Sequence, residues 1–348
     1  MNDRVGKREA LINEVWYGES FAFVVLLPFT AVFAVAAAIR RFLYRQNILR
    51  SHKIPVPVVV VGNIAVGGAG KTPITLWLVD VFKSKGKNPA IISRGYGGKQ
   101  MSSTILVTAD SDPGLVGDEP VLLARRSGCP VFVDPNRVNA ALSAVHAGAD
   151  IIISDDGLQH YRLQRDVEIA VVDGARGFGN GHLLPAGPLR EPVSRLDSVD
   201  RILIQNGKVE FRSGLPGEKT SCFTLAGVKL RRVNEEKTIA LSQLSGQSVH
   251  AVAGIANPLR FFEYLERHGI NVIRHPMPDH ARLSAASVTF DDDLAVVVTE
   301  KDAVKCNNIA HERLWYLPVD VAFDDGQDMR WIEALHAKLQ ASDLREST

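Results

Sequence analysis

The pattern of apolar and polar positions predicts a long alternation of strands and helices. Residues 58–61 are four consecutive valines, which is typical of a strand buried on both faces. Further apolar runs of strand length alternate with segments of helical periodicity. The predicted strands are 58–61, 89–93, 104–108, 130–134, 149–154, 167–173 and 201–205, and the helices follow residues 70, 117 and 135. This order indicates a doubly wound parallel α/β sheet whose last strand is 201–205.

A second, smaller α/β pattern begins after a polar stretch. Residues 228–233 alternate as a strand of a ribbon does, and the chain ends in a helix at 329–339. Between them lie predicted strands at 250–253, 272–274, 294–299 and 315–319, and a helix at 257–267. We therefore expect three parts: an N-terminal tail with an apolar helix (1–53), a larger α/β domain (54–215) and a smaller α/β domain joined by a ribbon-like linker (216–348).

The N-terminal segment 21–39 carries no charged residue. Its length is close to the roughly 20 residues that a helix needs to span a bilayer. Trp16 and Tyr17 precede it as interfacial anchors would, and arginines follow it from Arg40 onward, which places its C-terminal end on the cytoplasmic side. The acidic residues before it argue against a signal peptide. We expect a helix that lies on or in the membrane; a buried core helix is the alternative.

Charge and cysteine content exclude several classes of protein. The formal net charge is +1 and no basic run with interleaved aromatic residues occurs, so we expect no nucleic-acid partner. The three cysteines, Cys129, Cys222 and Cys306, are odd in number and far apart. A disulfide framework or a zinc site is therefore not expected.

The turn after the valine strand carries the strongest chemical motif. It matches the phosphate-binding loop G-x-x-x-x-G-K-[ST], except that alanine occupies the first glycine position. Glycines allow backbone N–H groups to surround an anion, the lysine can reach the β- and γ-phosphates, and the threonine can ligate Mg²⁺. The predicted nucleotide-binding residues are Ala65, Val66, Gly67, Gly68, Ala69, Gly70, Lys71 and Thr72. The larger domain is thus predicted to be P-loop NTPase-like and to bind ATP or GTP.

Acidic residues follow another predicted strand of the same sheet. Asp155 and Asp156 come directly after the apolar run 151–153, where nucleotide folds place the carboxylate associated with Mg²⁺. The guanine-reading motif [NT]-K-x-D has only an imperfect counterpart, Thr-Glu-Lys-Asp at 299–302, in which the lysine comes one place late. We therefore predict ATP with Mg²⁺ and not GTP.

Several basic and polar residues could bind a second, anionic substrate. They are Arg94 with Tyr96, Arg137, Arg176 and Arg190, although each alone is more often a surface or capping residue. His160, beside Gln159, could be a ligand, but a lone histidine is usually structural. The segment 174–192 is rich in glycine and proline, and we expect an ordered functional loop there.

Seven segments in order resemble the tetraacyldisaccharide 4′-kinase family. They are VGNIAVGGAGKTP (61–73), SRGYGG (93–98), GDEP (117–120), DDGLQH (155–160), GNGHLLPAGPLREP (179–192), PDH (278–280) and TEKDAVK (299–305). The resemblance implies transfer of the γ-phosphate of ATP to the 4′-hydroxyl of a lipid A disaccharide precursor, tetraacyldisaccharide 1-phosphate. It also implies a monomer at the lipid surface of the bacterial inner membrane, on the cytoplasmic face. The open alternatives are a membrane-associated GTP-binding switch and another P-loop ATPase or ligase.

The same resemblance assigns roles to individual residues. It makes Asp118 the general base and His280 its partner, with Lys71 as the third catalytic residue. Asp118 could instead cap the helix that follows it, and Ala281 stands where the family often has a second histidine. Acceptor binding is assigned to Arg94, Tyr96, Arg137, Gln159, Asn180 and Arg190, and metal binding to Thr72, Asp155 and Asp156.

Overall fold

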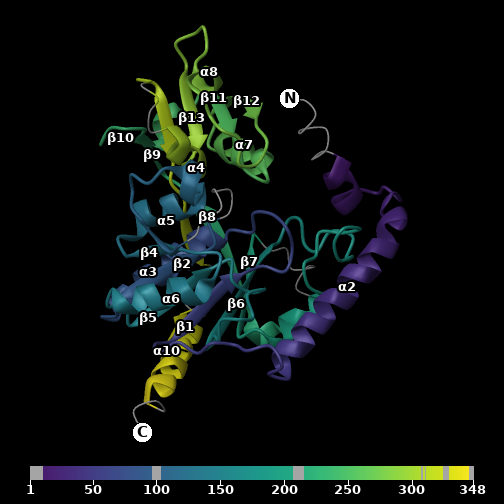
Figure 1. Cartoon of the computed structure of the whole chain (residues 1–348). Coiled ribbons are helices and arrows are strands. Elements are labelled where there is room, and N and C mark those ends of the chain that lie inside the picture. The colour runs from purple at the N-terminus through teal and green to yellow at the C-terminus, as the bar shows by residue number, and fades with distance from the viewer. Residues whose placement is uncertain are drawn as a thin grey trace.

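The chain forms two separate β-sheets, and the smaller one lies beyond one end of the larger one (Figure 1). The computed structural model describes residues 11–95, 103–206, 215–306, 309, 311–323 and 329–344. Among these, nine strands form the first sheet in the order β15-β8-β7-β6-β1-β5-β2-β4-β3, and six form the second in the order β10-β9-β14-β13-β11-β12. The first sheet lies in the larger domain, and the second in the smaller domain that covers one end of it.

The first sheet confirms the predicted doubly wound α/β arrangement. Its strands are parallel except for the two edges, β3 and β15. They are β1 (Val58–Gly62), β2 (Pro89–Ser93), β3 (Ile105–Val107), β4 (Val131–Val133), β5 (Ile151–Asp155), β6 (Val167–Asp173), β7 (Arg201–Gln205), β8 (Thr220–Ala226) and β15 (Asp320–Phe323). Its helices are α3 (Lys71–Ser84), α4 (Pro113–Val116), α5 (Asp118–Ser127), α6 (Arg137–His146) and α10 (Met329–Leu344).

The valines of β1 show why this strand lies at the centre. Val59 and Val61 pack into the core under α3 and α5, whereas Val58 and Val60 pack into the core on the α6 side. All four are at most 1% exposed. Because successive side chains of a strand point to opposite faces, an unbroken apolar run supplies both cores at once. Strand β1 lies between β5 and β6, so the loop that follows Gly62 lies at the carboxyl edge of the sheet.

The second sheet forms a separate core. Its strands are β9 (Lys229–Arg232), β10 (Thr238–Ala240), β11 (Ser248–Ala253), β12 (Asn271–Pro276), β13 (Ala295–Thr299) and β14 (Leu314–Leu317). Its helices are α7 (Pro258–Arg267), α8 (Ala285–Val288) and α9 (Glu300–Ala303), the last continued by the 3₁₀ turn η5 (Val304–Cys306). Strands β11 to β14 are parallel, and β9 and β10 add an antiparallel ribbon at one edge.

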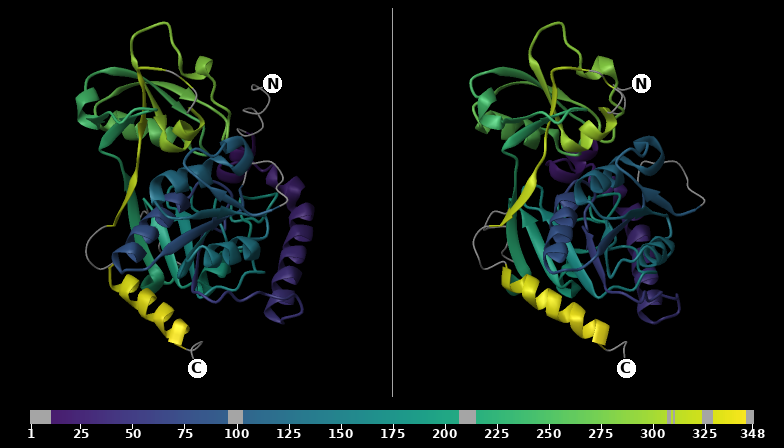
Figure 2. Two further views of the ribbon diagram at one scale, coloured as in Figure 1. Left: turned by 60° about the vertical axis from the view of Figure 1, so that its left-hand side comes forward. Right: turned by 90° about the vertical axis from the view of Figure 1, so that its left-hand side faces the viewer.

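The predicted boundary between the two domains is wrong. Residues 201–205 are not the last strand of the first sheet, because β8 and β15 extend it. Helix α10 also packs on the first domain: Trp331 lies 5.8 Å from Trp77 of α3, between ring centroids, and Leu335 and Leu339 are buried in the same core. The chain enters the second domain from β8 and returns through β15, side by side (Figure 2). The second sheet thus spans residues 229–317, inserted within the first domain.

The apolar N-terminal segment is a long helix on the flank of the first domain (Figure 1). Helix α2 (Phe23–Arg45) has Pro28 within it, and only 6% of its most apolar window is buried. The alternative of a buried core helix is therefore wrong. Thr30, on its inner side, accepts a hydrogen bond from the Ala186 N–H at 3.0 Å and donates one to the Leu183 carbonyl at 3.3 Å. These contacts tie α2 to the loop 179–192.

Candidate active site

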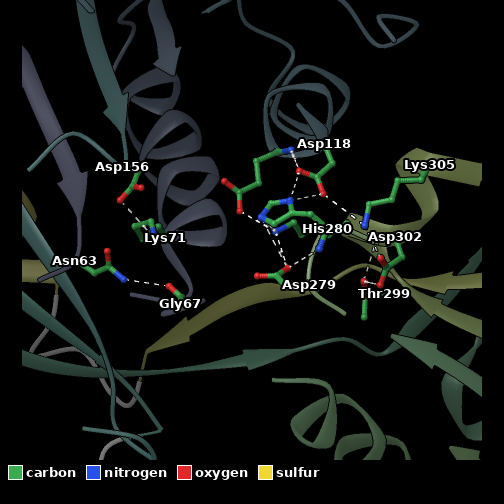
Figure 3. A network of polar contacts seen from close by, with 12 residues as sticks. Asn63, Gly67, Lys71, Asp118, Asp156, Asp279, His280, Thr299, Asp302 and Lys305 are labelled. Atoms are coloured by element: carbon green, nitrogen blue, oxygen red, sulfur yellow. Dashed lines mark hydrogen bonds and ion pairs between the residues drawn. The ribbon is translucent and has the colours of Figure 1, made fainter. Parts of the chain in front are cut away.

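The phosphate-binding loop connects β1 to α3. Gly67 and Gly70 have φ angles of 113° and 86°, in the left-handed region that favours glycine. Gly70 is the N-cap of α3, and Lys71 is the first helical residue, so the N–H groups of the first turn point out of the helix into the loop. The Asn63 side-chain amide donates to the Gly67 carbonyl at 3.1 Å and holds the loop in this shape (Figure 3). This geometry suits a bound phosphate.

Lys71 faces the acidic turn at the end of β5. Its Nζ lies 3.5 Å from Asp156 Oδ1, and Arg190 lies 3.2 Å from the other oxygen of the same carboxylate. Burial alone would raise the pKa of Asp156, but Lys71 and Arg190 lower it to about 2. The prediction that 155–156 lie beside the phosphate loop is thus supported by geometry, and Arg190 joins the same cluster.

Asp155 provides the second carboxylate. It is 1% exposed, and the Thr75 hydroxyl of α3 donates to its Oδ1 at 3.2 Å. Burial, together with the nearby Glu119 carboxylate, raises the pKa of Asp155 to about 7. Within the described part of the chain, its Oδ2 is buried without a hydrogen-bond partner. A buried carboxylate oxygen that lacks a partner is a suitable ligand for a cation.

The residues here fit Mg²⁺ in the manner of nucleotide-binding proteins. No group of three or more acidic, histidine or cysteine side chains among the described residues could hold a metal by itself. Mg²⁺ usually takes only one or two protein carboxylates and completes its shell with water and substrate phosphates. The Asp155 and Asp156 carboxylates and the Thr72 hydroxyl at the start of α3 supply ligands of that kind.

Two of the residues predicted to bind the acceptor hold parts of the site in place. Arg137 is 2% exposed and donates to the backbone carbonyls of Asp155 and Asp156 at 2.9 and 3.0 Å, so it braces the acidic turn. Asn180 donates to the carbonyls of Val15 and Ala186 at 3.1 and 2.8 Å and fastens the loop 179–192.

The remaining predicted binding residues lie nearer to the cluster. Gln159 donates to the Asn63 carbonyl at 3.0 Å and to Glu191 at 2.9 Å, and it lies 3.5 Å from Arg190. Arg94 is exposed at the carboxyl end of β2, next to the same edge of the sheet. Tyr96 lies outside the described residues. Arg176 donates to the Ala256 carbonyl of the second domain at 2.8 Å.

Asp118 and His280 meet at the boundary between the domains (Figure 3). The His280 Nδ1 lies 3.0 and 3.1 Å from the two Asp118 oxygens. His280 has a φ of 57°, so the loop 278–280 turns sharply to bring the ring to Asp118. Gly117 is the N-cap residue of α5, but it provides no side-chain cap, and Asp118 Oδ1 accepts a hydrogen bond from the Glu119 N–H at 3.0 Å, so Asp118 contributes to the start of the helix as well as to the pair with His280.

The surroundings of the pair favour a negatively charged Asp118 and a His280 that binds a proton more readily than a free histidine. Burial would raise the pKa of Asp118, but the hydrogen bond with His280 and the charges of Lys301, His280 and Lys305 hold it well below its ordinary value. The same hydrogen bond raises the pKa of His280, against burial and Lys301. Asp118 is therefore an anion at neutral pH, able to accept a proton or a hydrogen bond from a hydroxyl.

Sequence reasoning missed the residues on the other side of this pair. The segment 299–305 belongs to the family-like pieces, and its first four residues form an imperfect guanine-reading motif, but neither observation gives Lys301 or Lys305 a role. In the structure the Thr299 side chain caps α9 by accepting from the Asp302 N–H, and Asp302 is fully buried. Lys301 and Lys305 reach His280 and Asp118. The spacing of these lysines, four residues apart, was the available signal for a shared helical face.

Two cavities lie at the site. A small pocket adjoins the phosphate loop and is lined by Tyr17, Ala65, Asp173, Arg176 and Phe178 among others. An open cleft of about 1110 Å³ adjoins the Asp118–His280 pair and is lined also by Asp112, Arg282 and Lys305. The site therefore offers a nucleotide side and a separate side that is open to a large acceptor.

The sequence of the chain is similar to that of one family of kinases over most of its length. The family model for tetraacyldisaccharide-1-P 4′-kinase (LpxK) matches residues 22–340. The tetraacyldisaccharide 4′-kinase of Alkalilimnicola ehrlichii is 48% identical over 316 residues, covering 91% of this chain and 93% of its own. That of Methylobacillus flagellatus is also 48% identical over 316 residues, with 90% and 92% covered.

A solved structure shares the fold. The crystal structure of LpxK from Aquifex aeolicus in complex with ATP superimposes with a TM-score of 0.78 at 28% identity, covering 91% of this chain and 99% of that one. With a family model that spans both domains and relatives of this identity, the chain belongs to the tetraacyldisaccharide 4′-kinase family.

Proposed function

We propose how these residues carry out the family's reaction, the ATP-dependent phosphorylation of the 4′-hydroxyl of tetraacyldisaccharide 1-phosphate to give the 1,4′-bisphosphate. The observation that carries the proposal is the pairing of Asp118 with His280, beside an open cleft. Asp118 belongs to the domain that holds the phosphate loop, and His280 to the other domain. An acceptor in the cleft would thus meet an anionic carboxylate on the face of the domain that presents ATP.

The phosphate loop holds the nucleotide. Backbone N–H groups of residues 65–72 surround the β- and γ-phosphates, and Lys71 leaves Asp156 to neutralise charge on the phosphoryl group in transfer. Thr72, Asp155 and Asp156 would hold Mg²⁺, which neutralises phosphate charge when bound. Arg190, which lies 3.2 Å from Asp156, places a second cation beside the acidic turn at residues 155–156.

Asp118 acts as the general base. As the 4′-oxygen attacks the γ-phosphorus, its O–H bond breaks and Asp118 takes the proton, while the bond from the γ-phosphorus to the bridging oxygen breaks and ADP leaves. His280 holds the carboxylate in place through Nδ1. The low pKa of Asp118 suits a loose transition state, in which the hydroxyl needs little activation before the bond to phosphorus forms.

The lipid part of the acceptor and helix α2 meet at the membrane surface. The outer side of α2 and the residues before it carry exposed apolar side chains, including Phe21, Val25 and Val32 at 81%, 75% and 71% exposure. Such a helix can lie in the interfacial region with its apolar side in the acyl chains. The arginines at its C-terminal end support a location of the catalytic domain on the cytoplasmic face of the inner membrane. We propose that the enzyme acts there as a monomer.

One assay tests the proposal directly. Purified protein is incubated with Mg·ATP and the disaccharide 1-phosphate, and products are analysed by mass spectrometry for one added phosphate. We expect ADP release that depends on the acceptor. A parallel reaction with GTP distinguishes a switch protein, which would hydrolyse GTP without any acceptor. Nucleotide hydrolysis that is indifferent to the disaccharide would refute the proposed function.

A further inference from the structure

Two lysines approach the Asp118–His280 pair from the second domain. Helix α9 and the turn η5 place Lys301 and Lys305 four residues apart, so their side chains leave the same face. Lys305 Nζ lies 3.5 Å from Asp118 Oδ2. Lys301 Nζ lies 3.4 Å from His280 Nε2, the ring nitrogen that does not face Asp118. Both ends of the pair therefore meet a cation that belongs to one short helical segment.

Lys305 is held by a rigid buried anchor. Its Nζ lies 2.9 Å from Asp302 Oδ1, and Asp302 is 0% exposed. The other Asp302 oxygen accepts from the Thr299 hydroxyl at 2.7 Å (Figure 3). The same oxygen also accepts from the Gly254 N–H at 2.8 Å. A Cβ at residue 254 would meet Asp302 Oδ1 at 3.0 Å, so glycine allows this close approach. The ammonium group thus has a fixed position between the Asp302 and Asp118 carboxylates.

Lys301 fixes the protonation pattern of the histidine. An ammonium group only donates hydrogen bonds, so in neutral His280 the Lys301 ammonium at 3.4 Å favours Nε2 as an acceptor over the more distant Asp279 Oδ1, 3.8 Å from the same nitrogen. The proton of neutral His280 then resides on Nδ1, which donates it to Asp118. Lys301 is itself held by Glu119 at 3.0 Å and Asp279 at 3.5 Å. Hydrogen bonds therefore run in one direction, from Lys301 through His280 to Asp118.

We propose that Lys301 and Lys305 are positioning residues for phosphoryl transfer, which orient His280 and the Asp118 carboxylate from the second domain without contacting ATP. This inference rests on the proposed role of Asp118 as the general base. The charged groups that face the pair are the two lysines, Glu119 of α5, Asp279 of the loop 278–280 and Asp302 of α9; Arg282 lines the adjoining cleft. The lysines come from one domain and Asp118 from the other. The orientation of the Asp118 carboxylate therefore depends on the contact between the two domains.

The first experiment uses Lys305→Met, which keeps the length of the side chain and removes its charge. We expect kcat to fall roughly ten- to hundredfold, part of the full contribution of a general base, with KM for ATP within about twofold of the original. Lys305→Arg should restore most of kcat. Lys338→Met is the control, since Lys338 pairs with Asp200 far from the site, and it should leave kcat unchanged. If Lys305→Met does not fold, Lys305→Gln is measured in the same way.

A double variant separates positioning from a general structural effect. If Lys305 acts through Asp118, adding Lys305→Met to Asp118→Asn should change the residual rate by less than about twofold, because members of one unit are not additive. Independent losses that multiply would overturn the inference. Should Asp118→Asn itself remain active, the proposed base is wrong; if Asp118→Asn is inactive but Lys305→Met turns over normally, only the inference about the lysine fails.

The second experiment observes His280 directly. Proteins labelled with ¹⁵N-histidine are titrated by NMR, with His280→Gln used to assign the signal. Removing the cation in Lys301→Met should raise the pKa of His280, whereas Lys301→Arg should leave it near the original value, because Lys301 now opposes protonation of the ring. A titration curve that is the same with and without Lys301 would contradict its role.

Discussion

Arg260, on the first helix of the second domain, lies 2.5 Å from Asp173, at the carboxyl end of β6 in the first domain. The same guanidinium donates to the Gln205 side chain at 2.7 Å, at the end of β7. Gln205 in turn borders the phosphate loop, since a Cβ at Gly70 would meet its Oε1 at 3.1 Å. The contact between the domains is therefore built directly onto the nucleotide-binding edge of the sheet.

Weakening this contact should impair catalysis at a distance. Arg260→Met should lower kcat roughly ten- to hundredfold, because loss of the interdomain contact lets His280 and the two lysines move away from Asp118. Steady-state kinetics measure the change, and small-angle X-ray scattering should show a larger radius of gyration. Arg267→Met is the matched control on the same helix, where an exposed arginine pairs with Glu263 of its own helix. Equal effects of the two substitutions would contradict this explanation.

The Asp118–His280 pair should behave as one catalytic unit. Asp118→Asn and His280→Ala are each expected to lower kcat by about 10²–10⁴-fold with little change in ATP affinity. The double variant should be hardly slower than the poorer single variant. An asparagine side chain can still accept from the Glu119 N–H, as Asp118 Oδ1 does at 3.0 Å, so Asp118→Asn should keep the start of α5 intact. A fully active Asp118→Asn enzyme would remove Asp118 from the mechanism.

The pair should also make stability depend on pH in a defined direction. The hydrogen bond with Asp118 raises the pKa of His280 above its unfolded value of about 6.5. The folded state thus binds the proton more tightly, so this stabilisation is fully present below about pH 6.5 and disappears as the pH rises through the folded pKa. Thermal unfolding of the original protein and of His280→Gln, compared between pH 6 and 9, should show a difference that becomes smaller as the pH rises. A difference that grows with pH would contradict the assignment.

The outer side of α2 should control membrane binding separately from folding. Replacing Phe21, Val25 and Val32 with serine removes exposed apolar side chains, each worth roughly 1.5–3 kcal/mol when buried in lipid. Vesicle flotation should fall by at least about tenfold, and KM should rise for the long-chain acceptor but not for ATP. Thr30→Val, on the inner side, should instead loosen the loop 179–192 and leave flotation unchanged. Unchanged flotation of the triple variant would refute the membrane role.

The elements that depend on short-range patterns could be predicted from the sequence. The valine strand, the glycine loop and the acidic end of β5 follow from apolar runs and from glycine positions, and the structure places them together. The pairing of Asp118 with His280 came from family resemblance, because 162 residues separate the two in the chain. No periodicity encodes a contact of that kind.

The errors have a common physical origin in tertiary contacts. The partners of Arg137 could not be predicted either, because they are backbone carbonyls 18 and 19 residues further along. Strands β8 and β15 were missed as parts of the first sheet because they join it at one edge, where burial is incomplete and the apolar pattern is weak. Lys305 of η5 contacts Asp118 across the boundary between the domains, and Lys301 of α9 contacts His280 of the same pair. No local pattern in the sequence predicts these contacts.

The return of the chain through β15 has a consequence for biosynthesis. The edge strand β15 and helix α10 are the last parts of the kinase domain to leave the ribosome, after the whole inserted domain. Until they emerge, the aromatic cluster of Trp77 and Phe223 lacks Phe323 and Trp331 and remains uncovered. The contiguous inserted domain can fold during translation, whereas the catalytic domain must wait for the C-terminus. A ribosome that stalls or ends early near residue 319 would thus release a chain with an exposed apolar surface, and no partly active kinase.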